Sequence, residues 1–416
     1  MSDSHAISEK TAAPARWIVM AADVPLAPLV HGNRVRVAQM VAALRAAGFK
    51  IAYVYWERDP REGDVALMRS LVDELVVVRR ERNRFEKRAL RLRRGLAYAL
   101  SKAHVIGEGA WWRLVANRDT SALCPQELRE RTAELLTARN AVALLCVYGN
   151  LAPLADLARE RGIFSVVDTQ DVMHERAETL LKSGVKPTGL MVTRATESTW
   201  LARFDLVVAI QEREAATLRG MLDRSRVMTT EHGVRLADAT SVFVSEPNIV
   251  LLGSNNRPNQ HGLEWFTSAV WPLVLREVPD AKTLVFGPLS RTLSCFGPRV
   301  EACGEVRDVA EAYARARLVV NPVRVGSGLK IKTVEALAFA KALVTTSVGA
   351  DGLESAAGTA FLASDDPAQF AAACVRVLAD DAFARSLAGA GRAFAAERFG
   401  PERVYAPLVA AIRSHA

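Results

Sequence analysis

With 416 residues, of which 50% are hydrophobic, the chain is too long for one ordinary core, and we expect two domains. No run of about 18 uncharged apolar residues occurs, which excludes a membrane-spanning helix, and the five cysteines lack CxxC spacing, which disfavours a zinc site or a disulfide framework. The net charge is +8, and much of the excess positive charge lies in one stretch of the chain.

The first half of the chain alternates apolar strands with helices. Residues 1–15 are small and polar and are expected to be a disordered leader, and a helix is predicted from about His31 to Gly48. Strands are predicted at Trp17–Ala22, Ile51–Trp56, Glu74–Val78, Val142–Val147, Phe164–Asp168 and Leu206–Ile210. Because these runs are continuously apolar, they indicate parallel strands covered on both faces, in a doubly wound first domain spanning residues 16–235.

A basic stretch interrupts this alternation. Arg79–Arg94 holds nine basic residues and two glutamates, and Trp111 and Trp112 follow it. We expect a basic helical insertion over about 79–139. Three interpretations stay open. These are a solvated helix, contact with an anionic membrane surface that accepts Lys, Arg and Trp, and nucleic-acid binding. The last is disfavoured because no recognised module accompanies the charge, so no nucleic acid is expected as a partner.

A polar stretch around residues 227–247 separates a second set of elements from the first. Strands are predicted at Ile249–Leu252, Thr283–Phe286, Arg317–Asn321 and Ala342–Thr345, and helices at Gly262–Glu277, Pro367–Leu378, Ala382–Arg398 and Pro401–Ile412. The second domain is expected to span residues 236–398, with a C-terminal helix in residues 399–416. Two Rossmann-like domains of this kind face a cleft.

The segment from Asn321 to Glu354 carries the clearest chemical pattern. A strand is followed by the turn Gly326-Ser327-Gly328 and a helix predicted to begin at Leu329, with Lys330 and Lys332 in its first turn. Such a turn offers backbone N–H groups and the positive end of the helix dipole, which suit a phosphate. Lysines oppose that dipole, so a bound anion explains them. An ordinary βαβ turn with solvated lysines is the alternative.

These pieces, in this order, resemble GT-B fold glycosyltransferases of the retaining group 1, family 4 type, which act on bacterial polysaccharides and glycolipids. Residues 249–288 resemble the first strand and helix of their donor-binding domain. Residues 304–308 resemble their G-x-V-x-D turn near the nucleotide base, and residues 321–353 resemble their donor-diphosphate and ribose segment. The resemblance covers nearly the whole chain. It implies an α/β, GT-B fold whose C-terminal helix returns to the first domain.

The resemblance also implies a set of donor-binding residues. Lys330 and Lys332 would stabilise the charge of the departing diphosphate, and Arg257 would supply a further cation unless it pairs with a surface acid. Glu335 would accept hydrogen bonds from ribose hydroxyls, with a helix-surface position as the alternative, and the backbone of Val306 would meet the base. The full set is Gly253, Arg257, Val306, Gly326, Ser327, Gly328, Lys330, Lys332 and Glu335.

Ser327 marks a departure from the family pattern. Many relatives carry two glutamates across this loop and helix, and the first would stand eight residues before Glu335, where this chain has Ser327. The contact to the donor sugar is therefore in doubt, and with it the identity of the sugar.

In the first half, the resemblance points to Gly32 and Arg34 on the acceptor side. Gly32 would let the backbone approach donor or acceptor, and Arg34, or Arg36 in its place, would meet an acceptor phosphate. A plain helix N-terminus is the alternative for Gly32.

Residues 165–176 resemble the strand end that often carries a histidine near the reacting sugar, and Gln170 stands at that position here. Asp168 and Asp171 are the catalytic candidates, as a base or as stabilisers of an oxocarbenium-like state. A strand-end cap is the alternative for Asp168, and His174 is expected to be a structural histidine.

No metal and no cofactor is expected. No Asp-x-Asp pair that could hold a diphosphate through a cation follows a strand in the second domain, and Asp365-Asp366 indicates a helix N-cap.

The sequence thus predicts a cytoplasmic, hexosyltransferase-like enzyme, located on the inner face of the cell membrane if the basic stretch binds lipid. It would move a sugar from a nucleoside-diphosphate-sugar to a glycan or lipid-linked acceptor in cell-surface polysaccharide biosynthesis. A GT-B fold nucleotide-sugar epimerase and a non-catalytic nucleotide-sugar-binding scaffold are the alternatives. The base, sugar, acceptor, linkage and oligomeric state are not specified by the sequence.

Overall fold

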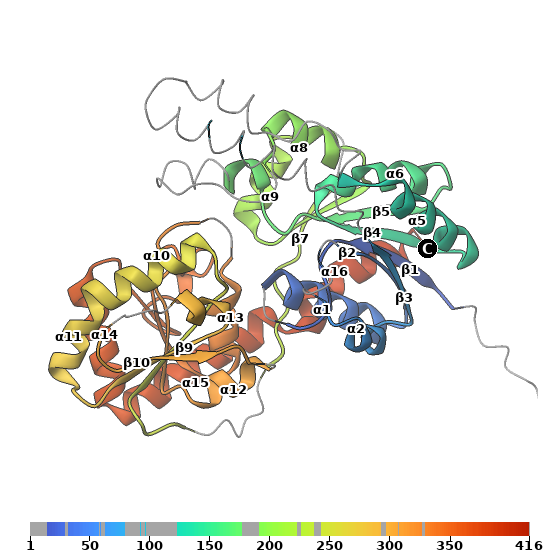
Figure 1. Cartoon of the computed structure of the whole chain (residues 1–416). Coiled ribbons are helices and arrows are strands. Elements are labelled where there is room, and N and C mark those ends of the chain that lie inside the picture. The colour runs from blue at the N-terminus through green and yellow to red at the C-terminus, as the bar shows by residue number, and fades with distance from the viewer. Residues whose placement is uncertain are drawn as a thin grey trace, which may run out of the picture.

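The structure is a computed structural model of the whole chain. It describes residues 15–415 except 30–31, 58, 60–62, 80–122 (where only Leu92 and Leu96 are described), 177–190, 223–225, 237–242, 293–296, 307 and 327–328. Two lobes lie side by side, each built on a central sheet with helices on both faces (Figure 1).

In the described part of the first lobe, seven parallel strands form one sheet in the order β3-β2-β1-β4-β5-β6-β7. They are β1 (Trp17–Ala22), β2 (Lys50–Glu57), β3 (Glu74–Arg79), β4 (Ala143–Val147), β5 (Phe164–Asp168), β6 (Leu206–Ala209) and β7 (Arg226–Thr229). Helices α1 (Gly32–Ala46) and α2 (Val65–Leu71) pack on one face. The other face carries α5 (Gln126–Ala138), α6 (Ala152–Arg159), α8 (Arg194–Leu201) and α9 (Glu212–Arg219). Burial on both faces explains the unbroken apolar runs.

The second lobe repeats this plan. Within its described residues, six parallel strands lie in the order β10-β9-β8-β11-β12-β13. They are β8 (Asn248–Leu252), β9 (Lys282–Phe286), β10 (Val300–Gly304), β11 (Leu318–Asn321), β12 (Ala342–Thr345) and β13 (Leu362–Ala363). Helices α12 (Val309–Ala314), α13 (Ile331–Ala338) and α15 (Asp381–Phe399) pack on one face, and α10 (Arg257–Trp265), α11 (Trp271–Glu277) and α14 (Pro367–Ala379) on the other.

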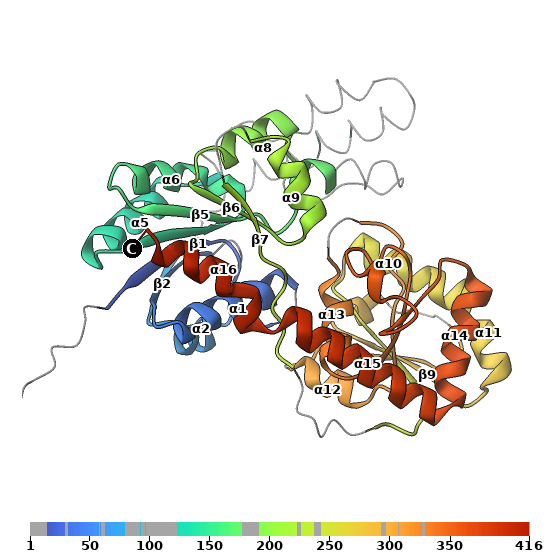
Figure 2. The ribbon, with the colours of Figure 1, turned by 180° about the vertical axis from the view of Figure 1, so that it is seen from behind.

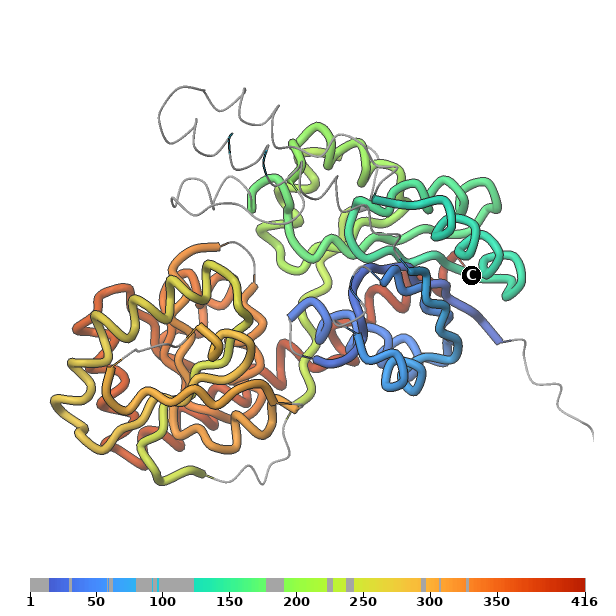
Figure 3. Tube along the Cα trace, viewed as in Figure 1, coloured from blue at the N-terminus to red at the C-terminus, as the bar shows by residue number. Residues whose placement is uncertain are grey.

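The chain crosses between the lobes at two adjacent places. One crossing follows β7, and the other runs through α15 and α16 (Pro401–Arg413), which continue in series from the second lobe into the first (Figures 2 and 3). The Val234 amide donates to the Phe399 carbonyl at 2.9 Å, and the Arg398 Nε donates to Glu231 Oε2 at 2.9 Å, so the crossings are bonded to each other. Tyr405 of α16 is fully buried in the first-lobe core.

The predicted fold class is confirmed, including the return of the C-terminal helix to the first lobe. Helix α10 begins at Arg257 rather than at the predicted Gly262, because the Asn256 side chain caps it by accepting from the Asn259 amide. The path to Glu277 includes a π-helical turn at Phe266–Val270. Pro272 lacks an N–H and cannot continue regular helical bonding there.

The predicted basic insertion lies largely outside the described residues, as do Trp111 and Trp112 and most of Arg79–Arg94. Its last part is helix α5, whose buried Leu128, Leu135 and Leu136 pack on the first sheet, so this part belongs to the lobe's core. Among the described residues, no helix is both long and apolar enough to cross a membrane.

Candidate functional site

The carboxyl ends of the second sheet surround a pocket. Leu252 ends β8 and Gly253 follows it, Gly287 follows β9, and Val306 and Val309 follow β10, with Lys332 completing the lining. The strand order reverses between β8 and β11, and ligands of open α/β sheets bind at such a switch point. A Cβ at Gly287, whose φ is +83°, would lie 2.5 Å from the Gly253 carbonyl oxygen, so glycine keeps the pocket floor as bare backbone.

Three predicted donor residues, Gly253, Val306 and Lys332, are thereby brought together. The Lys332 Nζ lies 2.9 Å from Oε2 of Glu335, whose side chain is only 2% exposed. The buried Tyr313 hydroxyl is 3.4 Å from the same oxygen. Glu335 is therefore on the buried side of α13, and the ammonium group of Lys332, which lines the pocket, orients its carboxylate.

Lys330 is the residue that precedes helix α13 rather than a member of its first turn. Its Nζ lies 3.8 Å from Oδ2 of Asp351, and burial lowers the pKa of Lys330 to about 8. A lysine held in such a place is stabilised in its charged form by any anion that enters. Gly326 has a φ of +126°, which glycine adopts readily; Ser327 and Gly328 lie outside the described residues.

Arg257 is exposed at the start of α10, and its Nη1 donates to Gln260 Oε1 at 3.1 Å on its own helix. Arg257 therefore makes a contact on the helix surface, and the pocket described above is lined by other residues.

The two lobes touch at the helix starts that the sequence analysis singled out. Gly32, the first residue of α1, lies against Ile331, the first residue of α13, so that a Cβ on Gly32 would be 2.5 Å from Ile331 Cδ1. The predicted acceptor-side glycine thus lies beside the two lysines across the lobe boundary.

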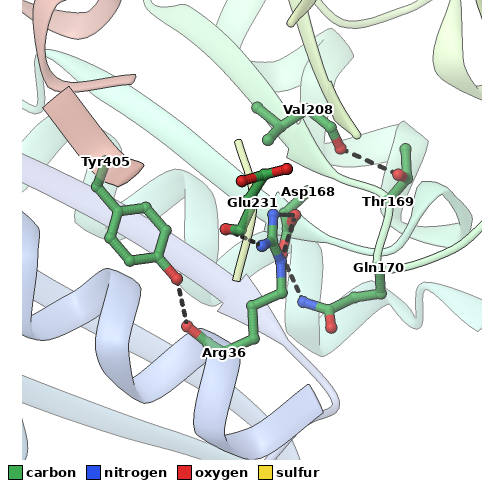
Figure 4. A network of polar contacts seen from close by, with 7 residues as sticks. All are labelled: Arg36, Asp168, Thr169, Gln170, Val208, Glu231 and Tyr405. Atoms are coloured by element: carbon green, nitrogen blue, oxygen red, sulfur yellow. Dashed lines mark hydrogen bonds and ion pairs between the residues drawn. The ribbon is translucent and has the colours of Figure 1, made fainter. Parts of the chain in front are cut away.

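Asp168, at the end of β5, forms a buried ion pair with Arg36 (Figure 4). Both side chains are fully buried; Arg36 Nη2 lies 2.7 Å from Oδ1, and its Nε lies 3.0 Å from Oδ2. Gln170, whose φ is +65°, donates its side-chain amide to the same carboxylate. Arg36 also donates to the Glu231 carbonyl oxygen at 2.7 Å and accepts from Tyr405 through its own carbonyl.

This network joins the first sheet, the crossing after β7 and helix α16. Burial opposes the charge on Arg36, but the Asp168 carboxylate outweighs it and raises the pKa of Arg36. Arg34 and Arg36, the arginines expected to meet an acceptor phosphate, are both buried. The Arg34 Nη1 lies 3.4 Å from the Pro28 carbonyl oxygen.

The side chain of the second catalytic candidate, Asp171, is mostly buried, with 20% of it exposed, and it pairs with Arg176 at 3.2 Å. Burial raises the pKa of Asp171, and its Oδ1 has no hydrogen-bond partner in the described part of the chain. His174 is buried, with Nδ1 2.7 Å from Glu197 Oε2, in agreement with the structural role expected for it.

Three polar side chains that the sequence analysis did not select also lie at the carboxyl edge of the first sheet. Gln211 precedes α9 and Glu214 lies in its first turn, shortly after β6, and His232 lies in the crossing after β7. Each is at least 97% buried, and none of their side-chain polar atoms has a hydrogen-bond partner among the described residues. Their position after a buried strand was the available signal, but the charged run Gln-Glu-Arg-Glu is typical of a solvated helix start.

Comparison with known proteins agrees with this geometry. Residues 246–380 match the family model described as Glycosyl transferases group 1. Sucrose-phosphate synthase from Thermosynechococcus elongatus is similar in structure, with a TM-score of 0.64, 17% identity, and coverage of 96% of this chain and 99% of that one. The pneumococcal O-GlcNAc transferase GtfA, in complex with UDP and GlcNAc, gives a TM-score of 0.65 at 8% identity, covering 96% and 99%.

HepE of Anabaena, in complex with UDP and glucose, gives a TM-score of 0.65 at 11% identity, covering 95% of this chain and 99% of that one. A Klebsiella pneumoniae protein described as an uncharacterized 44.6 kDa protein in the cps region is 23% identical over 173 residues. That match covers 39% of this chain and 45% of the relative, less than half the length of either.

The two lobes therefore form a GT-B fold, as the resemblance implied. The match to the Glycosyl transferases group 1 model, over residues 246–380, lies in the second lobe.

Proposed function

We propose that the chain is a glycosyltransferase that moves a sugar from a nucleoside-diphosphate-sugar to a glycan or lipid-linked acceptor. The observation that carries the proposal is the meeting of Lys332 with Gly253, Gly287 and Val306 in one pocket at the switch point of the second sheet. Backbone at three strand ends with a cation at a helix start suits a nucleotide with its phosphates.

In this proposal, Lys330 and Lys332 bind the diphosphate and stabilise the charge it gains as the glycosidic bond breaks. Both lysines now face carboxylates, Asp351 at 3.8 Å and Glu335 at 2.9 Å, so each is held in place before the donor arrives. Prior positioning of cations lowers the reorganisation needed during the reaction. Glu335 would take up the ribose hydroxyls beside Lys332.

Of the two catalytic candidates, Asp171 fits a proton acceptor better than Asp168. Both oxygens of Asp168 accept from Arg36, and the side chain is fully buried, whereas one oxygen of Asp171 lacks a partner within the described residues. We propose that Asp168 instead orients Gln170, the residue at the position where relatives often place a histidine.

The names of the relatives support a sugar donor and a polysaccharide context. HepE and GtfA were obtained with UDP and a sugar, and the Klebsiella protein is described by its capsule-gene region. We therefore propose a UDP-sugar donor and a cell-surface polysaccharide or glycolipid product. Retention at the anomeric carbon is proposed from the family resemblance alone, and the two lysines are the reason we propose a reaction without a divalent cation.

The direct test incubates the protein with labelled UDP-glucose or UDP-GlcNAc, with and without lipid-linked and glycan acceptors, in the presence and absence of EDTA. Label transferred to an acceptor in EDTA is the expected result. Conversion of the donor to an epimer without an acceptor would replace the proposal by the epimerase alternative. Binding without turnover of any donor would indicate a scaffold.

A further inference from the structure

Buried polar atoms without partners gather where the first lobe meets the lysine-bearing edge of the second. Gln211 is the extended residue that directly precedes α9, and Glu214 lies in the first turn of that helix. Both amide atoms of Gln211, both oxygens of Glu214 and both ring nitrogens of His232 have no hydrogen-bond partner among the residues the structure describes. Each such atom costs about 1–3 kcal/mol of desolvation if nothing compensates it, so a concentration of them suggests a site rather than a packing error.

Contacts across the lobe boundary place this group beside the proposed diphosphate site. Gln211 Oε1 lies against Gly352, where a Cβ would be only 2.5 Å away. The neighbouring Arg213 Nη2 lies 3.1 Å from Asp351 Oδ2, the same carboxylate that faces Lys330. Glu214 is within electrostatic range of Lys330, and His232 is within range of Lys332.

The three side chains are electrically neutral near pH 7. Burial raises the pKa of Glu214 to about 8, helped by Asp171, and burial lowers the pKa of His232 to about 3, helped by Arg36 and Lys332. A protonated carboxyl, an imidazole and a primary amide can each donate and accept a hydrogen bond. This is the pattern that sugar hydroxyls require, whereas a phosphate only accepts and carries charge.

We propose that Gln211, Glu214 and His232 form a sub-site for the hydroxyl groups of a sugar residue, adjacent to the lysines that take the diphosphate. The sub-site rests on the proposed glycosyltransferase function and names its specificity-determining residues in the first lobe. The turn at Asp351–Gly352 covers it in this structure, so the sugar reaches it when the Arg213–Asp351 contact opens. The sugar belongs either to the donor or to the acceptor, and the two sources give different readouts.

The experiment compares Glu214→Met, which removes hydrogen bonding at similar volume, with Glu214→Gln, which keeps a neutral donor and acceptor. Glu212→Met on the exposed face of the same helix is the matched control. Affinities for UDP, UDP-glucose and UDP-GlcNAc are measured by calorimetry, together with the KM of the acceptor. The melting temperature of each variant is recorded.

If the donor sugar occupies the sub-site, Glu214→Met binds UDP as the wild type does but loses about tenfold in affinity for the preferred UDP-sugar, and Glu214→Gln recovers most of it. If the acceptor sugar occupies it, UDP-sugar affinity is kept and the acceptor KM rises about tenfold. The melting temperature of Glu214→Met stays at or above that of the wild type, because a buried carboxyl without a partner has been removed.

A Glu214→Met protein with wild-type affinities and acceptor KM overturns the sub-site while leaving the glycosyltransferase proposal intact. The same holds if its melting temperature falls and Glu214→Gln restores only the stability. A wild-type protein that binds neither UDP nor any UDP-sugar overturns the proposed function, and the sub-site with it.

Discussion

The two sheets present carboxyl edges of opposite character. At the second sheet, Lys330 and Lys332 face carboxylates at the start of α13, and the pocket floor is bare backbone. At the first sheet, the ion pair Arg36–Asp168 is fully buried, and the buried side chains of Gln211, Glu214 and His232 have polar atoms without a hydrogen-bond partner among the described residues. We propose from this difference that the second lobe binds the charged diphosphate and the first lobe binds sugar hydroxyl groups.

The largest expected effect concerns the buried ion pair. Arg36→Met should lower the free energy of unfolding by about 3–5 kcal/mol, because it leaves the Asp168 carboxylate buried and unpaired. Urea denaturation measures this, with Arg276→Met in an exposed pair as a control that changes little. If Asp168→Asn instead kept full stability but abolished turnover, Asp168 would be a catalytic residue. The carboxyl edge of the first sheet would then contribute a charged group to the reaction.

The next effect concerns the charged edge. Lys332→Gln should lower kcat/KM by about 10²–10³-fold, since it removes a positioned cation from the developing diphosphate charge. Steady-state kinetics with the preferred UDP-sugar provide the measurement. Lys282→Gln, at the opposite end of the same sheet, is the matched control, and equal losses in both variants would mean that the lysines act only through stability.

A smaller effect is expected where the edges touch. Gly32→Val should reduce kcat/KM by about ten- to a hundredfold, because the added side chain displaces Ile331 and with it the start of α13. Ile331→Ala in the same chain should restore most of the activity by making room. Absence of rescue would show that Gly32 matters for its own backbone rather than for this contact.

The smallest effect is a pH dependence of diphosphate binding. Lys330 is charged below its pKa of about 8. The affinity for UDP should therefore change little up to about pH 7 and fall several-fold as the pH rises through 8. Asp351, Arg213 and Glu214 also face this amine. Calorimetry on Lys330→Met should give a flat profile, and Glu214→Gln should keep the fall; a fall that disappears with Glu214→Gln would assign the titration to the carboxyl.

Local patterns were sufficient to predict much of the fold. Parallel strands buried on both faces are continuously apolar, so strands such as Trp17–Ala22 and Phe164–Asp168 were predicted with their observed bounds. The strands β10 and β13 were not predicted. Val300–Gly304 is mostly half-buried and contains a glutamate, and Leu362–Ala363 has only two residues, so neither shows an apolar run.

The candidate site was predictable only where chemistry is local in sequence. A stretch of six residues contains Lys330, Lys332 and Glu335, and the glycine turn before it indicates the start of a helix. The Arg36–Asp168 pair joins residues 132 positions apart, and Gln211 lies against the turn at Gly352 from the other lobe. Sequence spacing does not indicate such contacts between distant residues, so neither the pairing of Asp168 with Arg36 nor the burial of Glu214 could be predicted from it.

The proposed function depends most on the binding of a nucleoside diphosphate by Lys330 and Lys332. Titration of UDP, ADP and GDP by calorimetry into the wild type, the Lys330→Met/Lys332→Gln variant and Lys282→Gln tests it without any assumption about sugar or acceptor. We predict that at least one nucleotide binds the wild type and Lys282→Gln equally, and binds the double variant at least about a hundredfold more weakly. A folded double variant that keeps the wild-type affinity would contradict the claim.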